Sequence, residues 1–207
     1  MEDKNNKIGL KNELLRKAIH LSSVIIPISY YYIENNILLI VVGTGTLFMI
    51  LLDVFRKIFP TVNEYYVKVI GFVLRKKEVN VKEHILTGGT YYAIGIFLPL
   101  LLFEREIAST AILIMIICDS FAALIGKKFG KHGLWNKTIE GSITFFIVGL
   151  IIVILTPKVT NSHTEYIYAI IALLIATLIE ALPFEIDDNI TIPVSFGIIY
   201  TIFLYFI

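Results

Sequence analysis

The stretch that decides the fold runs from residue 107 to residue 126 and reads I-A-S-T-A-I-L-I-M-I-I-C-D-S-F-A-A-L-I-G. It contains 20 residues, and Asp119 is its single charged residue. About 20 predominantly apolar residues are enough for a helix to cross the roughly 30 Å hydrocarbon core of a bilayer. The stretch therefore predicts a membrane-spanning helix with one carboxylate inside it.

The composition of the whole chain agrees with this prediction. Of its 207 residues, 57% are hydrophobic and 17% are charged, and the mean hydropathy is +0.79. Soluble domains have about 45–50% apolar and about 25% charged residues. These values exclude a disordered chain, a basic nucleic-acid binder and almost any soluble enzyme. The one cysteine, Cys118, is expected to be a small buried hydrophobe without a disulfide partner.

Outward from the central stretch, the sequence predicts an all-α integral membrane protein with a single polytopic domain over residues 1–207. Seven apolar stretches come near the length of a span, and the weakest, 88–103, would also fit a re-entrant segment. No cleavable signal peptide is expected, because the first apolar run begins in a charged turn and has no small-residue cleavage site. The predicted spans are 14–33, 37–53, 88–103, 107–126, 139–156, 166–183 and 190–207.

The positions of lysine and arginine predict the orientation. Sixteen of the 18 basic residues lie around the start of the first predicted span or in the second and fourth connections, and only Arg105 and Lys158 fall on the other side. Cytoplasmic segments of membrane proteins carry such an excess of basic residues. We therefore expect a cytoplasmic N-terminus and an outer C-terminus, with the cell membrane as the location.

The long second connection has a helical periodicity of its own. Apolar residues between Val62 and Val73 recur on one face, and charged residues lie off that face. The pattern predicts an amphipathic helix over about 60–75 that lies in the cytoplasmic interface. A packing helix capped by a solvated charge run is the alternative.

Ionisable side chains within spans are costly and mark functional sites, and here they gather near the predicted cytoplasmic ends. In the first span, Glu13, Arg16, Lys17 and His20 share an arc of about 100° on one helix face. Snorkelling to the lipid headgroups would explain Arg16 and Lys17 alone. It explains less well why an acidic residue and a histidine share their stripe.

Asp119 starts a second group of polar residues in the fourth span. Small residues follow on its helix face, and such a stripe usually marks a close contact between membrane helices. The helix then opens into a loop whose glycines and lysines would suit a phosphate group. The residues concerned are Ala122, Ala123, Gly126, Lys127, Lys128 and Gly130.

The third group opens the fifth span with Lys137, Thr138, Glu140 and Gly141. Thr138 would serve as an N-cap, and Glu140 would be favoured by the positive end of the helix. Lys137 is unexpected at that end unless an anion binds there. This group therefore has both a capping interpretation and a ligand-binding one.

The fourth group is acidic and surrounds the sixth connection, which carries no lysine or arginine. Glu180 and Glu185 precede the pair Asp187 and Asp188. Together with Asn189 and Asp119, this pair would hold a hard divalent cation such as Mg²⁺ through oxygen ligands. A turn that caps the last helix is the alternative. Separately, Asp53 at the end of the second predicted span is interpreted as a terminal residue in the headgroup zone.

Basic groups, glycines and carboxylates at one membrane face suit phosphoryl or nucleotidyl transfer from a nucleotide to a lipid. A nucleotide with Mg²⁺ would arrive from the cytoplasm, and a carboxylate would orient or deprotonate the lipid hydroxyl. The chain has no Walker A motif, no Rossmann glycine fingerprint and no protein-kinase signature set. No nucleic-acid partner is expected.

The chain resembles the CTP-dependent lipid kinase family that contains dolichol kinase, phytol kinase and the fungal CTP-dependent diacylglycerol kinase. The resemblance rests on four blocks, 13–20 (ELLRKAIH), 88–92 (GGTYY), 119–141 and 187–193 (DDNITIP). The block 119–141 is the most specific. Asn136 departs from the family pattern, because dolichol kinases carry Lys-Lys-Thr before Glu-Gly, and the gap after Gly130 is slightly shorter.

The resemblance implies a kinase that transfers the γ-phosphate of CTP to a polyprenol, a phytol-like alcohol or diacylglycerol. It implies essential roles for Arg16, Lys17 and Asp119, to which we add Glu140 as a catalytic residue. The oxygen donors of Asp119, Asp187 and Asp188 remain the expected magnesium ligands. The residues expected to bind CTP are His20, Gly126, Lys127, Lys128, Gly130, Lys137, Thr138 and Gly141.

Two other functions stay open. Phosphatidate cytidylyltransferases carry a similar block to 119–141, but also a His-Gly-Gly segment followed by Asp-Arg near the C-terminus, where this chain has Asp187, Asp188 and Asn189. Such an enzyme would break CTP at the α-phosphate and release pyrophosphate. A small transporter without catalytic activity is less well supported, because transporters more often place their polar groups near the bilayer midplane.

Overall fold

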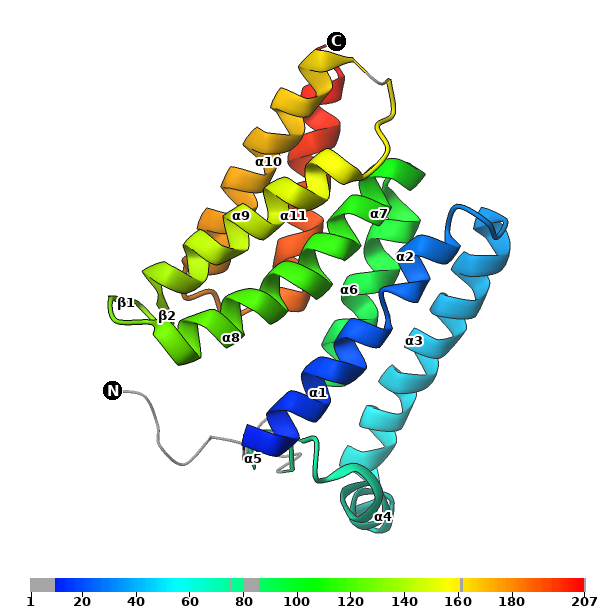
Figure 1. Ribbon diagram of the computed structural model, residues 1–207. Helices are drawn as coiled ribbons and strands as arrows, with labels where there is room; N and C mark the ends of the chain where they lie inside the picture. Colours follow the sequence, from blue (N-terminus) through cyan, green and yellow to red (C-terminus); the bar gives the residue numbers. More distant parts are fainter. Residues whose placement is uncertain (1–9, 75, 80–85, 161, 207) are drawn as a thin grey trace.

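The computed structural model describes residues 10–74, 76–79, 86–160 and 162–206, except for the side chains of 10–14 and 76–77. The side chains of Glu13 and of the basic residues 75–77 and 82 therefore lie outside the described part of the chain, together with the predictions made for them. Figure 1 shows a bundle of helices with one small hairpin. The elements are α1 (Leu10–Ser22), α2 (Ile25–Ser29), α3 (Asn35–Ile58), α4 (Pro60–Ile70), α5 (Lys76–Val79), α6 (Gly88–Leu102), α7 (Arg105–Leu113), η2 (Ile114–Cys118), α8 (Asp119–Phe129), β1 (Gly133–Leu134), β2 (Lys137–Thr138), α9 (Ile139–Leu155), α10 (His163–Ala181) and α11 (Asp188–Leu204).

Residues 105–129 form one continuous helix, made of α7, η2 and α8, in the middle of the bundle (Figure 1). Of its most apolar window, 67% is buried within the protein. Ile107, Ile112 and Ile116 are at most 1% exposed, and α6, α9 and α11 pack against this helix. The stretch predicted to span the membrane is therefore also the centre of the core.

The π-helical segment η2 ends immediately before Asp119. A π-helical turn holds one residue more than the hydrogen-bonded turn of an α-helix, and such insertions are frequent at functional sites. In an uninterrupted α-helix one extra residue would rotate everything that follows by about 100°, whereas the wider π-helical turn takes up that residue and keeps the flanking α-helical turns in register. The face on which Asp119 lies therefore depends on η2.

Three helices are long and apolar enough to cross a membrane, Asn35–Ile58, Arg105–Phe129 and His163–Ala181, and α6, α9 and α11 are shorter apolar helices. Only 17% of the apolar window of α3 is buried in the protein, and Ile40, Val41 and Leu47 are more than half exposed. So large an exposed apolar surface is expected to face lipid. The helices fit the predicted all-α membrane class, and the count of seven spans stays a prediction.

The prediction of one helix over 14–33 is wrong. The chain forms α1 up to Ser22 and α2 from Ile25, with a turn between them. Pro27 has no N–H to donate to the carbonyl of Ser23 four residues earlier, and its ring crowds that carbonyl. The backbone turns instead, and the N–H of Ser23 donates to the carbonyl of His20 at 3.1 Å.

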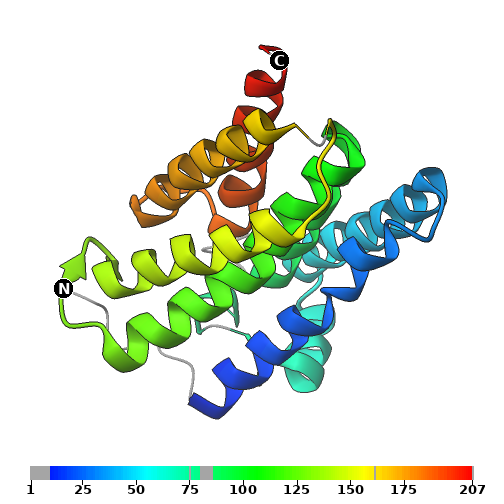
Figure 2. The ribbon, with the colours of Figure 1, turned by 45° about the horizontal axis from the view of Figure 1, so that its top comes forward.

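The helices alternate in direction, so the connections fall at two ends of the bundle. In Figure 1 the start of α1, the helix α4 and the hairpin lie at the lower end, whereas the α2–α3 turn, the α9–α10 connection and the C-terminus lie at the upper end. Figure 2 shows α8 and α9 side by side, joined by the hairpin. The lower end carries the basic connections that predict the cytoplasmic side.

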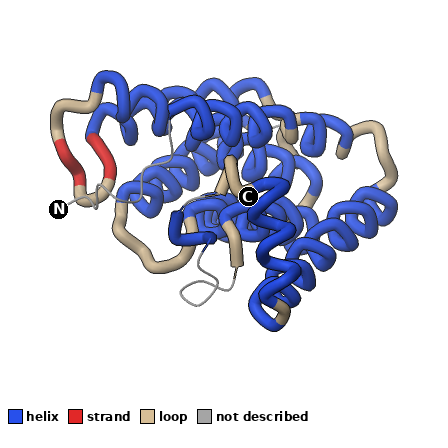
Figure 3. The backbone as a smooth tube through the Cα atoms, turned by 90° about the horizontal axis from the view of Figure 1, so that it is seen from below, coloured by secondary structure: helices blue, strands red, loops and turns tan. Residues whose placement is uncertain are grey.

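The hairpin consists of β1 and β2, which are antiparallel with Leu134 opposite Lys137. Its two-residue loop is Trp135 and Asn136, and Trp135 has a φ of 49°. Figure 3 shows the hairpin at one edge of the molecule. The hairpin therefore forms an exposed projection between α8 and α9.

Asp53 lies inside α3, is 1% exposed, and does not end the helix as predicted. Its carboxylate accepts hydrogen bonds from Arg56 Nη1 at 2.9 Å, from the backbone N–H of Thr87 at 2.8 Å and from Thr90 Oγ1 at 2.5 Å. Arg56 is also 1% exposed, and a buried guanidinium requires such a partner. The headgroup interpretation of Asp53 is therefore wrong, and the pair ties α3 to the start of α6.

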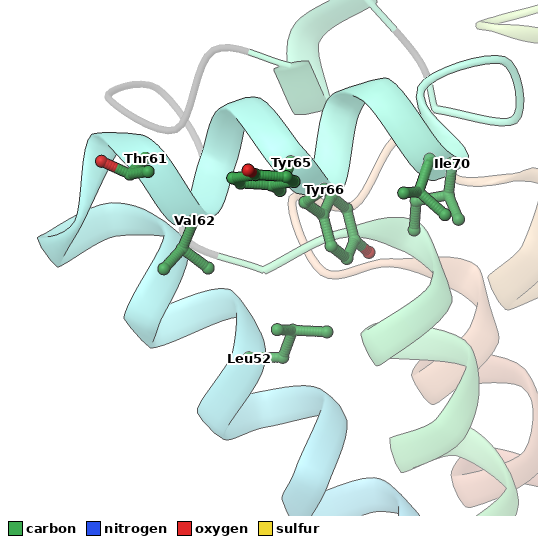
Figure 4. A pocket seen from close by; sticks show the side chains of 7 residues that line it. Leu52, Thr61, Val62, Tyr65, Tyr66 and Ile70 are labelled. Carbon is green, nitrogen blue, oxygen red and sulfur yellow. The ribbon is translucent and has the colours of Figure 1, made fainter.

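The helix α4 lies across the end of α3 and is shorter than the predicted 60–75 (Figure 1). Arg56 holds it in place, because its Nη2 donates to Asn63 Oδ1 at 3.0 Å and its guanidinium lies 3.8 Å from the ring centre of Tyr66. Figure 4 shows an apolar groove beneath α4. Its volume is about 470 Å³, and it is lined by Leu52, Thr61, Val62, Tyr65, Tyr66, Val69 and Ile70.

Candidate active site

A short ion pair joins Lys17 of α1 to Asp119 at the start of α8, with 2.5 Å between Nζ and Oδ2. Lys17 is 6% exposed, whereas the side chain of Asp119 remains 23% exposed. A buried ammonium group requires an anionic partner, and Asp119 supplies it. The structure thus brings together the first and second groups of polar residues predicted from the sequence.

Two aromatic side chains fix the part of α1 that carries this lysine. His20 stacks on Tyr92 of α6, with ring centres 4.0 Å apart. The hydroxyl of Tyr92 donates to the carbonyl of His20 at 3.0 Å and also contacts the hydroxyl of Ser23. Arg16 lies one residue before Lys17 and is half-buried. The predicted residue His20 is therefore placed in a contact between helices beside the ion pair.

A second lysine is shared by two carboxylates. Lys137 of β2 donates to Glu180 Oε1 of α10 at 2.5 Å and to Asp188 Oδ2 of α11 at 2.7 Å. Burial alone would lower the pKa of Lys137, but Asp188 and Glu180 together outweigh it and raise that pKa above its ordinary value. Lys137 is therefore a firmly protonated cation held between two helix ends.

The two ion-paired groups form one cluster. Lys137 acts electrostatically on Asp119, and Asp119 in turn acts on both Glu180 and Asp188. The cluster draws on α1, α8, β2, α10 and α11, at the end of the bundle that carries the hairpin. Two cations fixed by three carboxylates give an arrangement in which phosphate oxygens can replace carboxylate oxygens as partners of the lysines.

The sequence places Glu180 in the fourth polar group but predicts no catalytic, nucleotide-binding or metal-binding role for it. It is 2% exposed and also accepts a hydrogen bond from Ser142 Oγ at 3.4 Å. A sequence signal was present, because Glu180 lies in the last turn of α10 and an acidic residue is unfavourable at the negative end of a helix. Its buried position is stabilised by Lys137, which comes from a distant part of the chain.

The small residues after Asp119 pack α8 against α9 around Thr138. Thr138 caps α9, since its Oγ1 accepts from the N–H of Gly141 at 3.1 Å. A Cβ at Gly126 would lie 2.7 Å from that oxygen, and a Cβ at Gly130 would lie 2.6 Å from Thr138 Cγ2. These distances are too short for any side chain. The helix-contact and capping interpretations are confirmed, and the phosphate-binding role of these residues stays a prediction.

The other predicted site residues between 119 and 141 lie nearer the surface of the protein. Lys127 and Lys128 are exposed in the last turn of α8. Glu140 lies in the first turn of α9, and its Oε1 is 2.7 Å from His132 Nδ1. The contacts of Glu140 are therefore with the hairpin, and the structure does not join it to the Lys17–Asp119 pair.

The predicted magnesium ligands do not form a metal site by themselves. Asp187 caps α11, because its Oδ1 accepts from the backbone N–H of Asn189 at 3.0 Å, while Asp119 and Asp188 each pair with a lysine. Within the described ranges, no three His, Cys, Asp or Glu side chains are grouped so as to hold a metal ion. Binding of Mg²⁺ by these residues stays a prediction.

Comparison with known proteins places the whole arrangement in a family. The family described as the cytidylyltransferase family matches residues 10–183, which include nearly every residue discussed above. The chain belongs to the cytidylyltransferase family. The matched range contains Lys17, Asp119, Lys137 and Glu180, and of the cluster only Asp188 lies beyond it.

Named relatives of this cytidylyltransferase-family chain are lipid kinases. The chain is 32% identical over 195 residues to an uncharacterized protein of Rickettsia prowazekii, and the matched region covers 93% of this chain and 95% of that protein. It is 30% identical over 147 residues to CTP-dependent diacylglycerol kinase 1 of Eremothecium gossypii, covering 68% of this chain and 45% of that kinase. It is 26% identical over 210 residues to a probable chloroplastic phytol kinase of Zea mays, covering 90% and 65%.

These relatives confirm the resemblance to the CTP-dependent lipid kinase family. The chain spans less than half the length of the Eremothecium kinase and about two thirds of the maize one. No solved structure matches the chain.

Proposed function

We propose that this protein transfers the γ-phosphate of CTP to the hydroxyl of a membrane lipid alcohol. The observation that carries the proposal is the cluster in which Lys17 pairs with Asp119 while Lys137 pairs with Glu180 and Asp188. It lies at the end of a membrane bundle, where a water-soluble nucleotide and a lipid hydroxyl can meet. The names of the relatives support CTP as the donor and a lipid as the acceptor.

In the proposed reaction, the hydroxyl oxygen of the lipid attacks the γ-phosphorus of CTP. The bond between that phosphorus and the oxygen bridging to the β-phosphorus breaks, and CDP leaves with this oxygen. The hydroxyl proton passes to the carboxylate of Asp119, which acts as the general base. The products are CDP, the phosphorylated lipid and a protonated Asp119, which returns its proton to water.

Lys17, Lys137 and Arg16 have an electrostatic role in this proposal. Charge on the transferring phosphoryl group is spread over its three oxygens, and positioned cations stabilise it. In the described state both lysines are already paired with carboxylates. When the triphosphate enters, its phosphate oxygens would therefore replace carboxylate oxygens as partners of the two lysines. The ammonium groups are already held in place by burial.

A cytidylyltransferase reaction is the second candidate, because the description of the matching family names it. In that reaction a lipid phosphate oxygen attacks the α-phosphorus of CTP, and pyrophosphate leaves. The same lysines would then bind the leaving group. The relatives named as kinases favour the first reaction over this one.

Labelled CTP separates the two reactions. Purified protein in liposomes is incubated with α-labelled or γ-labelled CTP and with diacylglycerol, a polyprenol, phytol or phosphatidate. The kinase reaction moves γ-label to an alcohol and leaves α-label in CDP. Transfer of α-label to phosphatidate with release of pyrophosphate contradicts the proposal. Parallel reactions with Mg²⁺ or with EDTA test the predicted cofactor, and γ-labelled ATP tests the choice of nucleotide.

A further inference from the structure

A large aromatic residue occupies a backbone conformation that usually excludes it. Trp135 is the first residue of the two-residue loop between β1 and β2, and its φ is 49°. Loops of this length need a positive φ at that position, and Asn or Gly normally fill it. For a bulky residue such a φ is a genuine outlier. Strain of this kind persists at ligand-binding sites more than elsewhere.

Trp135 gains little inside the protein in return for this strain. It is 63% exposed, and in the described part of the chain its indole takes part in no ring stacking, cation–π contact or hydrogen bond. A tryptophan normally buries much of its ring and finds a partner for its N–H. The exposed indole is therefore available to a ligand.

The surroundings of Trp135 identify the kind of ligand. Lys137 lies two residues further on, so the two Cα atoms are at most about 7 Å apart, and its ammonium group points into the charged cluster. The hairpin thus presents an exposed aromatic ring outside and a cation inside. A nucleotide has the matching order, with a flat base at one end and phosphates at the other.

We propose that Trp135 stacks on the cytosine base of the bound nucleotide, while the phosphates lie toward Lys137. This inference rests on the proposed function and adds the residue that binds the base. Stacking would explain why an exposed tryptophan is kept at a strained loop position. Anchoring in the membrane interface, a common role of tryptophan, needs no such backbone and is treated as the competing outcome of the test.

Fluorescence tests the proposal without any turnover, because Trp135 is the one tryptophan of the chain. Full-length protein in liposomes is titrated with CTP, with CMP and with inorganic tripolyphosphate, and a parallel sample contains brominated phospholipid. Stacking predicts that CTP and CMP quench the emission and that tripolyphosphate does not. Quenching by brominated lipid with no response to CTP or CMP overturns the proposal in favour of interface anchoring.

Kinetics give a second measurement. Trp135→Gly removes the ring and also suits the positive φ, so the variant is expected to fold at least as well as the wild type. Stacking predicts that its KM for CTP rises roughly 5- to 100-fold while kcat changes much less. Trp135→Phe should restore most of the affinity. The matched control is Phe206→Ala, an exposed aromatic near the C-terminus at the other end of the bundle, which should leave KM unchanged.

An unchanged KM in Trp135→Gly overturns the stacking proposal and leaves the kinase proposal intact, because wild-type transfer of γ-label is measured in the same assay. Absence of transfer by the wild type contradicts the proposed function instead. The fluorescence response to CMP remains informative in that case, since it reports on base binding alone.

The groove beneath α4 supports a second, independent inference. It is lined almost entirely by apolar side chains, and Tyr65 and Val69 on its rim are 68% and 65% exposed. Its lining includes Leu52 of α3, a helix whose exposed apolar side chains require lipid around them. Figure 4 shows Leu52 of α3 and Val62, Tyr66 and Ile70 of α4 around the same space.

We infer that this groove binds a hydrocarbon chain of a membrane lipid. An amphipathic helix in the interface buries its apolar face at the boundary between headgroups and acyl chains, so acyl or isoprenoid chains are the molecules that reach the groove. Lys57 and Lys68 are exposed on α3 and α4 and would lie near an anionic headgroup. We therefore assign the hydrocarbon chain to an anionic phospholipid, and binding of the lipid alcohol is the competing outcome of the test.

Native mass spectrometry of the detergent-purified protein tests this inference. Val69→Trp fills the groove at an exposed position that tolerates a larger side chain, and Val41→Trp is the matched control at 62% exposure on the far part of α3. We expect the wild type and Val41→Trp to retain a lipid and Val69→Trp to lose most of it. An adduct with the mass of a phospholipid supports the assignment, whereas an adduct with the mass of a lipid alcohol overturns it. Equal retention by all three proteins, or no retained lipid, overturns the inference.

Discussion

At the scale of single residues, the site depends on where its cations are held. Lys17 comes from a predicted span and Lys137 from a predicted loop, and the ammonium group of each pairs with a carboxylate. Their partners Asp119 and Glu180 lie on different helices. The identity of the charged residues was visible in the sequence, but their pairing requires the packed bundle.

Asp119→Asn tests the central carboxylate. The amide has nearly the same shape but cannot accept the hydroxyl proton and no longer neutralises Lys17, so we expect kcat to fall about 100-fold or more. Size-exclusion chromatography in detergent should still give a single folded peak. Glu64→Gln, an exposed carboxylate on α4, serves as control and should keep its rate. Near-normal turnover by Asp119→Asn would show that the assignment of the base is wrong.

The charge of Lys137 leads to a prediction about pH. Its pKa is raised in the folded protein by Asp188 and Glu180, which outweigh burial. A raised pKa means that the stabilisation is complete below the unfolded value of about 10.4 and is lost as pH rises through the folded value. The Tm difference between wild type and Lys137→Met should therefore be constant from about pH 7 to pH 9 and shrink above about pH 10.5.

Lys131→Met is the control for this experiment, because Lys131 is exposed in the same loop. Its Tm should follow the wild type across the whole pH range. A difference between wild type and Lys137→Met that already disappears near pH 8 would contradict the assignment of a raised pKa.

Glu180 and Asp53 show the limit of prediction for single residues. Both were recognised as acidic residues near the ends of predicted spans, and neither was predicted to be fully buried. Each is stabilised by a cation that the linear pattern does not reveal, Lys137 for the first and Arg56 for the second. The partner of a buried charge comes from tertiary packing, which one sequence read in isolation does not specify.

At the scale of elements, the contact between α8 and α9 depends on residues without room for a side chain. Gly126, Gly130 and Gly141 all approach Thr138, which caps α9. The small-residue stripe after Asp119 predicted such a contact correctly. The same contact also orients the hairpin, because Thr138 ends β2. The sequence did not indicate this second role.

Gly126→Ala tests this contact. The added Cβ would lie 2.7 Å from Thr138 Oγ1, and overpacking of this kind lowers the free energy of unfolding by about 1–3 kcal/mol. Combining it with Thr138→Ala, which relieves the clash but removes the cap, should cost less than the sum of the single changes. Gly133→Ala is the control, because its Cβ would meet no described atom within 4 Å. Additive effects would contradict the packing role.

The junction of α3, α4 and α6 depends on one buried ion pair. Replacing Arg56 by Met leaves Asp53 as an unpaired buried charge, and losing one partner of such a pair costs about 3–5 kcal/mol. Lys57→Met, at the exposed neighbouring position, should change stability by less than about 0.5 kcal/mol. Thermal unfolding in one detergent compares the two variants. Equal stability of both would contradict the structural role of the network.

Helix boundaries were predicted well where apolar runs are long and less well where a local residue interrupts them. The stretch 107–126 falls inside Arg105–Phe129 as expected. The stretch 14–33 is divided into two helices, because Pro27 removes a backbone hydrogen-bond donor. The hydropathy of the stretch gives no sign of this division. Apolar content predicts how much of the chain enters the membrane, whereas single proline residues decide where a helix ends.

At the scale of the whole molecule, the charges separate between the two ends of the bundle. The hairpin, α4 and the ion-paired cluster lie at one end, and the connection with Lys158 lies at the other. Even Lys158 is 4% exposed, since its Nζ donates to the carbonyls of Val153 and Thr156 at 2.5 and 2.6 Å. The nearly neutral net charge of +1 therefore conceals a strongly asymmetric molecule.

This asymmetry predicts the topology in the cell. Cys118 is 0% exposed and should not react, so single cysteines can be introduced without replacing it. We expect an impermeant maleimide to label Tyr205→Cys, at a position 88% exposed near the C-terminus, in intact cells. Lys131→Cys in the hairpin should react only after permeabilisation. The reverse pattern would contradict a cytoplasmic site.

The π-helical segment before Asp119 has a consequence for comparing relatives. Because η2 contains an additional residue in its turn, a relative that is one residue shorter here would form an unbroken α-helix and still present its aspartate on the same side. A one-position gap in an alignment at Ile114–Cys118 would then indicate a conserved site geometry rather than a divergent one. Phylogenetic comparison of this family should therefore align the aspartate by its place in the helix and not by the count of residues from Arg105.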